Sequence, residues 1–300
     1  MFADRRVVLL LREYYVPVAL DVWYEQRRED TPGEFFRSIA AQRPDYDPEN
    51  TAQGLYVATP RGDLLEYTNH RDPGRLRGAL DAAFKKAEKL EGSRGPAPKA
   101  APASDPAFER FPPKGTCVVR VYSRVVEGRW KVEKVGLWDT IRREATGRDL
   151  LWILREEVEA LRRGEVAPAL ARRIARFHLI DNTRGEPPMW AADEVAAVSL
   201  AAEPEGDTRC VIRGSARLAS RDGARSFDAA IYGVAEFSRD GLARFDLVAR
   251  GAHCGCGRYT GDPPESPFTV AIAFTIARDD EAANVPPAGA RMLRDYLAPP

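Results

Sequence analysis

The chain has 300 residues, of which 44% are hydrophobic and 30% are charged, a composition typical of soluble globular proteins with buried cores. Its 45 lysines and arginines are balanced by 45 aspartates and glutamates, so no net positive charge favours binding to nucleic acid or to an anionic membrane. No apolar run approaches the roughly 20 residues that span a bilayer. We therefore expect neither a nucleic-acid partner nor a membrane span.

The first residues, MFADRRVVLLLREYY, do not fit the pattern expected of a secretion signal. Charged residues precede a short apolar run, VVLLL, which is shorter than the roughly 7–15 apolar residues of a signal peptide. We expect a cytoplasmic protein from the sequence as given, and an exported one if a longer N-terminus precedes Met1.

The clearest boundary in the chain is the stretch EGSRGPAPKAAPASDPAFERFPPKG, residues 91–115. Proline, alanine and glycine dominate it, and it has no periodic apolar pattern, which is typical of a linker. The sequence therefore predicts two domains, residues 1–90 and residues 116–300.

Residues 1–90 alternate between helical and strand patterns in the order α-β-α-β-β-α. DRRVVLLLREY predicts a helix capped by Asp4, and YVPVALDVW (15–23) predicts a buried strand. TPGEFFRSIAAQ predicts a helix with Thr31 as its N-cap, because proline and glutamate follow at the expected positions.

A hairpin and a last helix complete the first domain. GLYVATPRGDLLEYTN (54–69) predicts two short strands around a turn. RDPGRLRGALDAAFKKAEKL predicts a helix. Its predicted apolar face consists of Leu76, Leu80, Ala83, Phe84 and Ala87.

The first domain resembles the thioredoxin-like family over most of residues 1–90. FADRRVVLLLREYYVPVALDV is similar to the family's run from the end of the first helix into the second strand, and QGLYVATPRGDLLEYTN to its later hairpin. The resemblance implies an α/β fold that lacks its N-terminal part, because the family's Cys-x-x-Cys precedes that helix. A rival alignment places Tyr15–Val18 on the Cys-x-x-Cys itself.

Both alignments imply a redox-inactive domain. Residues 1–116 contain no cysteine, and thiol chemistry needs a thiolate. Residues 51–55, TAQGL, also lack the proline that faces the redox pair in the family.

Residues 116–300 predict an α+β domain with a helical block and an antiparallel meander. A strand pair, 116–126 and 129–136, is followed by helical patterns at 136–145, 149–164 and 166–180. Five strand patterns follow, some joined by Asp-Gly turns typical of hairpins. They span residues 195–203, 208–219, 225–238, 242–252 and 267–277.

This second domain resembles the C-terminal half of an uncharacterised bacterial family that pairs a degenerate thioredoxin-like domain with an α+β domain. FHLIDNTRGEPPMW, GLARFDLVARG and PFTVAIAFTI carry the resemblance. It implies an architecture and no activity.

The stretch GAHCGCGRYTG holds the most chemically reactive residues of the chain. His253, Cys254 and Cys256 predict a soft-metal site for Zn or Cu(I), or a thiol-redox site, provided that further ligands come from elsewhere. The alternative is a glycine-rich strand end without chemistry. The other cysteines, Cys117 and Cys210, lie in apolar strand patterns and are expected to be small buried residues.

The loop DNTRGEPPMW is the second candidate. His178 could act as a base beside Asp181, although the same residues suit a structural connection between a helix and a sheet. For partner binding the candidates are Trp23, Tyr24, Arg184 and Trp190.

The sequence as a whole favours a non-catalytic binding or scaffolding protein without a cofactor, whose partner is a protein or peptide. The first alternative is a thiol-redox or metal-binding protein that uses His253, Cys254 and Cys256, and the second is a hydrolase or isomerase built on His178 and Asp181.

Overall fold

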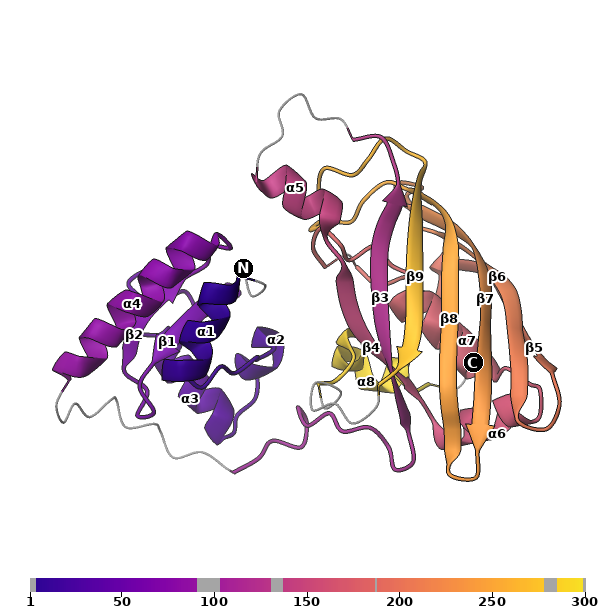
Figure 1. The fold of residues 1–300 in the computed structure, drawn as a ribbon, viewed down its shortest axis with the longest axis horizontal. Coiled ribbons are helices and arrows are strands. Elements are labelled where there is room, and N and C mark those ends of the chain that lie inside the picture. The colour runs from indigo at the N-terminus through magenta and orange to yellow at the C-terminus, as the bar shows by residue number, and fades with distance from the viewer. Residues whose placement is uncertain (1–3, 91–102, 131–136, 187, 278–284, 299–300) are drawn as a thin grey trace. The chain divides into compact units, whose positions relative to one another are not determined.

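The computed structural model describes residues 4–90, 103–130, 137–186, 188–277 and 285–298. The chain divides into two compact units, Met1–Glu109 and Arg110–Pro300, each with its own antiparallel sheet (Figure 1). Most of the predicted linker, residues 91–102, lies outside the described residues. Residues 103–109 belong to the first unit, where Asp105 accepts a hydrogen bond from the Glu29 backbone N–H at 2.9 Å.

The first unit contains the predicted hairpin and the predicted helices. Its described elements are α1 (Arg5–Tyr14), α2 (Val22–Glu25), α3 (Thr31–Ala40), β1 (Leu55–Ala58), β2 (Leu64–Thr68) and α4 (Pro73–Lys89). Strands β1 and β2 pair antiparallel. On α4, Leu76, Leu80 and Ala83 are buried as expected, whereas Phe84 and Ala87 are exposed.

Aspartates cap the helices of the first unit. Asp4 accepts hydrogen bonds from two backbone N–H groups at the start of α1, as predicted. The predicted cap of α3 is wrong by one residue, because Asp30 is the N-cap and accepts from the Gly33 N–H, and Thr31 is the first helical residue.

The strand predicted over residues 15–23 is wrong. Its first part joins α1 to α2 without strand pairing to any described residue. The carboxylate of Asp21 then accepts a hydrogen bond from the Trp23 N–H at 2.9 Å and starts α2. β-Branched and aromatic residues favour a strand only where a second strand is present to pair with it.

The second unit is built on a seven-stranded antiparallel sheet of order β4-β3-β9-β8-β7-β6-β5. Its described strands are β3 (Cys117–Glu127), β4 (Gly147–Ile153), β5 (Val195–Pro204), β6 (Arg209–Ala219), β7 (Ser226–Ser238), β8 (Gly241–Cys254) and β9 (Phe268–Ile276). The five predicted meander strands are confirmed as β5 to β9, which pair in sequence order.

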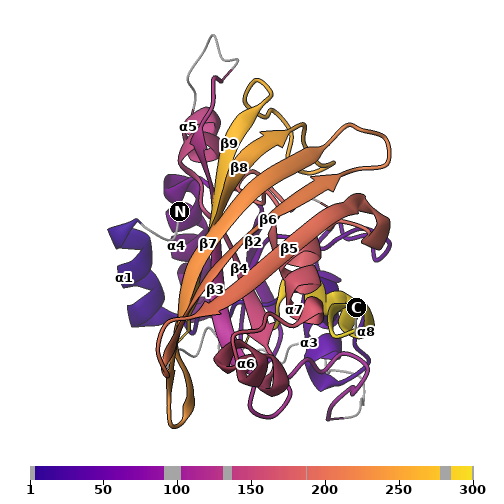
Figure 2. The ribbon, with the colours of Figure 1, turned by 90° about the vertical axis from the view of Figure 1, so that its right-hand side faces the viewer.

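Helices cover one face of this sheet, which curves around them (Figure 2). The described helical segments of this unit are α5 (Leu137–Glu144), α6 (Arg155–Arg162), α7 (Pro168–Arg173), a π-helical segment (Ile174–His178), α8 (Leu293–Tyr296) and two short 3-10 helices (Ala192–Glu194 and Ala288–Met292). Strand β8 alternates between its two faces, with Phe245, Leu247 and Ala249 buried under the helices and Val248 exposed on the other face.

The helix predicted over residues 149–164 is wrong in its first half. Gly147–Ile153 forms β4 and pairs with β3, and the helix begins only at Arg155. A short apolar run fits a buried strand as well as a helix, and pairing with β3 decides between them. The strand predicted at 129–136 lies mostly outside the described residues, and β4 and β9 are the described neighbours of β3.

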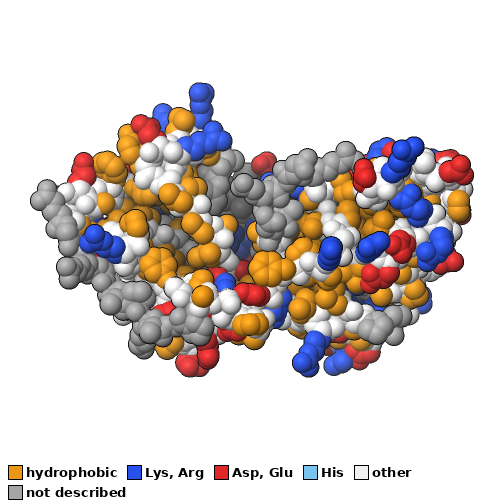
Figure 3. All heavy atoms as spheres, turned by 90° about the horizontal axis from the view of Figure 1, so that it is seen from below, with side chains coloured by type: hydrophobic (Ala, Val, Ile, Leu, Met, Phe, Trp, Pro, Cys, Tyr) orange, Lys and Arg blue, Asp and Glu red, His pale blue; other side chains and the backbone are white. Residues whose placement is uncertain are grey.

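The described helices include none that is both long enough and apolar enough to cross a bilayer. On the face of the second unit drawn in Figure 3, basic and acidic side chains are mixed with hydrophobic ones. This view shows no region of a single charge sign.

Candidate functional site

The His-Cys-Gly-Cys stretch lies at the end of β8, and the structure does not bring its three reactive side chains together. His253 is only 2% exposed and lies between the rings of Phe227 and Phe268, with centroid distances of 5.7 and 5.0 Å. Strand alternation directs Cys254 to the opposite face. Gly255 then adopts φ +75°, which ends the alternation and leaves Cys256 exposed.

The cysteines are all free thiols. Cys210 is buried as expected, and Cys117 is partly exposed. Within the described ranges, no group of three His, Cys, Asp or Glu side chains is arranged to hold a metal ion.

His178 does not pair with Asp181. Its Nδ1 lies 3.2 Å from Oδ2 of Asp149, and its Nε2 lies 3.1 Å from the hydroxyl of Tyr296. That hydroxyl also accepts a hydrogen bond from the Trp152 N–H. His178 and Tyr296 are each 1% exposed, so this chain of polar groups links the C-terminal helix α8 to β4 inside the fold.

The Asp181 carboxylate instead stabilises a turn in the loop that follows the π-helical segment. Its Oδ1 accepts hydrogen bonds from both the N–H and the hydroxyl of Thr183, at 3.1 and 2.6 Å. Its Oδ2 lies 2.7 Å from Nη1 of Arg184, and both side chains are almost completely buried.

Arg184 is an arginine with a fully buried side chain and few polar contacts. Its guanidinium lies against the rings of Trp130 and Phe268, with Cζ 5.9 and 5.5 Å from the centroids. Apart from the Asp181 contact, its Nε, Nη1 and Nη2 find no hydrogen-bond partner among the described residues. We call Trp130, Arg143, Asp181, Arg184 and His253 the arginine–histidine cluster.

The two predicted candidates therefore meet in space. Phe268 contacts both His253 from the Cys-x-Cys stretch and Arg184 from the DNTRG loop. Sequence reasoning missed Phe268, which the pairing of β9 with β8 places opposite His253. It also missed Trp130 and Arg143, whose contacts are visible only in the folded chain.

The predicted partner-binding residues lie mostly inside the protein. Trp190 is 1% exposed and donates from Nε1 to the Leu179 carbonyl, and the Arg225 guanidinium stacks 3.9 Å from its ring. The side chains of Arg184 and Tyr24 are also buried. Trp23 is half-buried, so these residues do not form an exposed contact surface.

Burial lowers the pKa of His253 from its ordinary value of 6.5 to about 4. The charge of Asp181 opposes this shift, and the charges of Arg225 and Arg184 add to it. The imidazole is therefore neutral at pH 7.

This depressed pKa predicts acid destabilisation. The unfolded chain takes up a proton at His253 below about pH 6.5, while the folded chain resists it until about pH 4, so the stability present at pH 7 is lost as the pH falls. Between pH 7 and pH 5 we expect this residue to lower the free energy of unfolding by about 2 kcal/mol.

Urea unfolding of the wild type and of His253→Phe at both pH values checks this expectation. The variant places an apolar ring between Phe227 and Phe268. Its free energy of unfolding should fall by about 2 kcal/mol less than that of the wild type between pH 7 and pH 5. An identical pH dependence in the two proteins contradicts the prediction.

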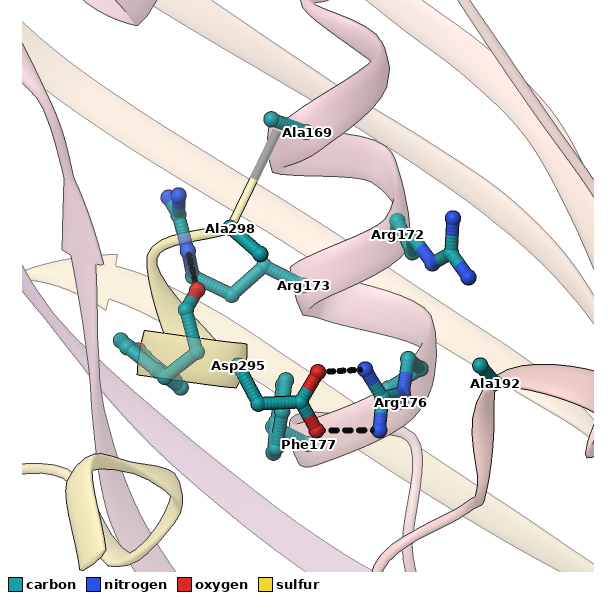
Figure 4. Close-up of a pocket in the computed structure, with 9 residues that line it drawn as sticks. Ala169, Arg172, Arg173, Arg176, Phe177, Ala192, Asp295 and Ala298 are labelled. Atoms are coloured by element: carbon teal, nitrogen blue, oxygen red, sulfur yellow. Dashed lines mark hydrogen bonds and ion pairs between the residues drawn. The ribbon is translucent and has the colours of Figure 1, made fainter. Parts of the chain in front are cut away.

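A cavity of about 110 Å³ lies between α7, the π-helical segment and the C-terminal segment (Figure 4). Arg176 makes two hydrogen bonds of 2.7 Å to the carboxylate of Asp295, and Arg173 donates from Nε to the Tyr296 carbonyl at 2.8 Å. In the close-up the Arg172 side chain points away from Asp295 and makes neither of these contacts. The two more buried arginines thus serve to hold the C-terminal segment.

The first unit presents an exposed apolar segment, residues 16–20. Val16, Val18 and Leu20 are 89%, 68% and 55% exposed, and Leu9 and Tyr14 on the preceding helix are also exposed. The peptide groups of residues 16–20 form no hydrogen bond to the described part of the chain.

Comparison with known proteins adds no relative, because no protein-family model matches the chain and no match is found among curated proteins or solved structures.

Proposed function

We propose that the chain is a non-catalytic binding protein and that its first unit docks a protein or peptide through the exposed apolar segment. The observation that carries this proposal is the exposure of Val16, Val18 and Leu20 in one unpaired stretch. Large apolar side chains gathered on a surface are typical of interaction sites.

The backbone of this segment favours pairing with an extended peptide of the partner. In an extended chain, Val16, Val18 and Leu20 direct their N–H and C=O groups to one edge. Pro17 lacks an N–H group, which weakens the opposite edge. Unpaired edge groups beside apolar side chains provide the interactions of β-strand addition, in which the main chain gives affinity and the side chains give specificity.

The thioredoxin-like character of this unit is part of the proposal. The β1–β2 hairpin followed by α4 agrees with the order expected for the end of such a domain. The absence of cysteine from residues 1–116 supports a binding role without thiol chemistry.

The test compares Val16→Asp/Val18→Asp with the wild type in the full chain. Partners captured by a photo-crosslinker at position 20 are identified, purified and titrated against both proteins. We expect the double variant to bind at least about tenfold more weakly, a loss of roughly 1.4 kcal/mol or more. The reason is that charged side chains replace two apolar side chains that the bound partner would cover.

Val248→Asp is the matched control, since Val248 is also exposed but lies on the outer face of β8. It should bind as the wild type does. Equal affinities of all three proteins for every captured partner contradict the proposal.

A further inference from the structure

The Arg184 guanidinium is short of acceptors. Its five N–H donors lie in a side chain with no exposed surface, and the described residues offer one carboxylate oxygen, Oδ2 of Asp181. Buried polar groups in folded proteins are nearly always hydrogen-bonded, and a buried charge without such bonds is strongly destabilising. Most of the donors of Arg184 therefore have no acceptor among the described residues.

Two other buried nitrogen atoms of the cluster are also unpartnered within the described residues. Nδ1 of His253 has no hydrogen-bond partner, although its ring is 2% exposed. Nε of Arg143 is unpartnered as well, and its guanidinium lies 5.8 Å from the Trp130 centroid, a ring that Arg184 also contacts. Arg143 and Arg184 thus leave polar atoms unused beside Trp130. His253 and Arg184 do so beside Phe268.

The charges of the cluster favour an anion. Arg143 and Arg184 carry two positive charges, and Asp181 supplies one negative charge. One oxygen of Asp181 is already used by Thr183, so only the other faces Arg184. Near the cluster, Arg225 adds positive charge, although Glu194 and Asp222 partly offset it.

The loop between β8 and β9 packs beside this buried cluster and reaches the surface. A Cβ atom at Gly185 would lie 1.9 Å from the Tyr259 carbonyl oxygen, so this loop packs directly on the backbone next to Arg184. Tyr259 is 64% exposed, whereas Thr260 is 1% exposed, so the loop runs from solvent to the interior within two residues.

We propose that the arginine–histidine cluster binds the oxyanion group of a small molecule, a carboxylate or a phosphate. The planar guanidinium of Arg184 donates two parallel hydrogen bonds to such a group, and Nδ1 of His253 supplies a further polar contact. Trp130 and Phe268 provide an apolar surface for the rest of the ligand.

The test titrates the full-length protein with inorganic phosphate and, separately, with acetate, at constant ionic strength set by potassium chloride. The readout is the set of arginine Nε–Hε NMR resonances. We expect one resonance, absent from Arg184→Lys, to shift saturably with one of the two anions. Phosphate and acetate as separate arms distinguish the two ligand classes.

Arg184→Lys should weaken binding by about tenfold or more, since lysine keeps the charge but loses the planar pair of donors. Arg250→Lys is the control, because Arg250 is exposed and pairs with Glu127, and it should leave the titration unchanged. If Arg184→Lys does not fold, Asp181→Asn/Arg184→Gln replaces both charges and should abolish the saturable shift. No response of Arg184 to either anion, or an equal response of exposed arginines, overturns the proposal.

Discussion

Replacing Arg173 by leucine is expected to lower the free energy of unfolding of the second unit by about 3–5 kcal/mol. The Arg173 side chain is 1% exposed, and its Nη1 lies 2.8 Å from Oε2 of Glu157, which is 3% exposed. The same nitrogen donates to the Trp152 carbonyl, and Nε donates to the Tyr296 carbonyl. Leucine leaves the Glu157 charge buried without its counter-ion, and urea unfolding measures the cost.

Two further variants separate the ion pair from general effects of substitution. Arg173→Leu/Glu157→Gln should recover part of the loss, because the amide keeps an acceptor for the Leu154 N–H and removes the unpaired charge. Arg155→Leu breaks an exposed pair with Glu159 and should cost less than about 1 kcal/mol. If Arg173→Leu and Arg155→Leu have similar stabilities, the buried pair does not stabilise the fold as argued.

This ion pair belongs to the same polar network as His178. Asp149, His178 and Tyr296 form a carboxylate–imidazole–hydroxyl series, an arrangement also found in catalytic sites. Here burial raises the pKa of Tyr296, so the hydroxyl stays protonated. Because the hydroxyl accepts from the Trp152 N–H and the Tyr296 carbonyl accepts from Arg173, the series anchors α8 to β4 and α7.

The meander of the second unit could be predicted because its signals are local. Asp-Gly turns at 222–223 and 240–241 separate strands whose apolar residues alternate, and the structure confirms both hairpins. The predicted helix at 149–164 failed because seven residues of β4 pair with β3, a contact that no local pattern reveals. The same limit applies to α6, because no local pattern reveals that the charged Glu157 is buried opposite Arg173.

The sequence was enough to predict some residues of the candidate site but not how their side chains are arranged. The sequence drew attention to His253 and to Asp181, and both belong to the arginine–histidine cluster. The expected convergence of Cys254 and Cys256 assumed a continuous strand, which Gly255 interrupts with a left-handed backbone. The contacts of Arg184 with Trp130 and Phe268 depend on the folded sheet.

Replacing Trp190 by alanine is expected to lower the free energy of unfolding of the second unit by about 3–5 kcal/mol, the usual range for removing a large buried aromatic residue. Its side chain is 1% exposed and belongs to the main hydrophobic core beneath the sheet. Alanine removes the Nε1 hydrogen bond to Leu179 and the ring on which Arg225 stacks. The midpoint of urea unfolding measures this loss. Hydrogen exchange of the β7 and β8 amides then shows whether the loss reaches the sheet.

Trp190→Phe divides this loss into its packing and polar parts. The phenyl ring keeps much of the apolar contact but leaves the Leu179 carbonyl without its donor, so we expect a cost of about 1–3 kcal/mol. Tyr232→Ala removes an aromatic ring from the exposed face of the same sheet, where Tyr232 is 52% exposed, and should cost less than about 1 kcal/mol. A similar loss for Trp190→Ala and Tyr232→Ala would mean that the helix-covered face is not the core that holds the sheet. We instead expect the largest loss for Trp190→Ala, because Trp190 packs in the core and its ring also contacts Arg225.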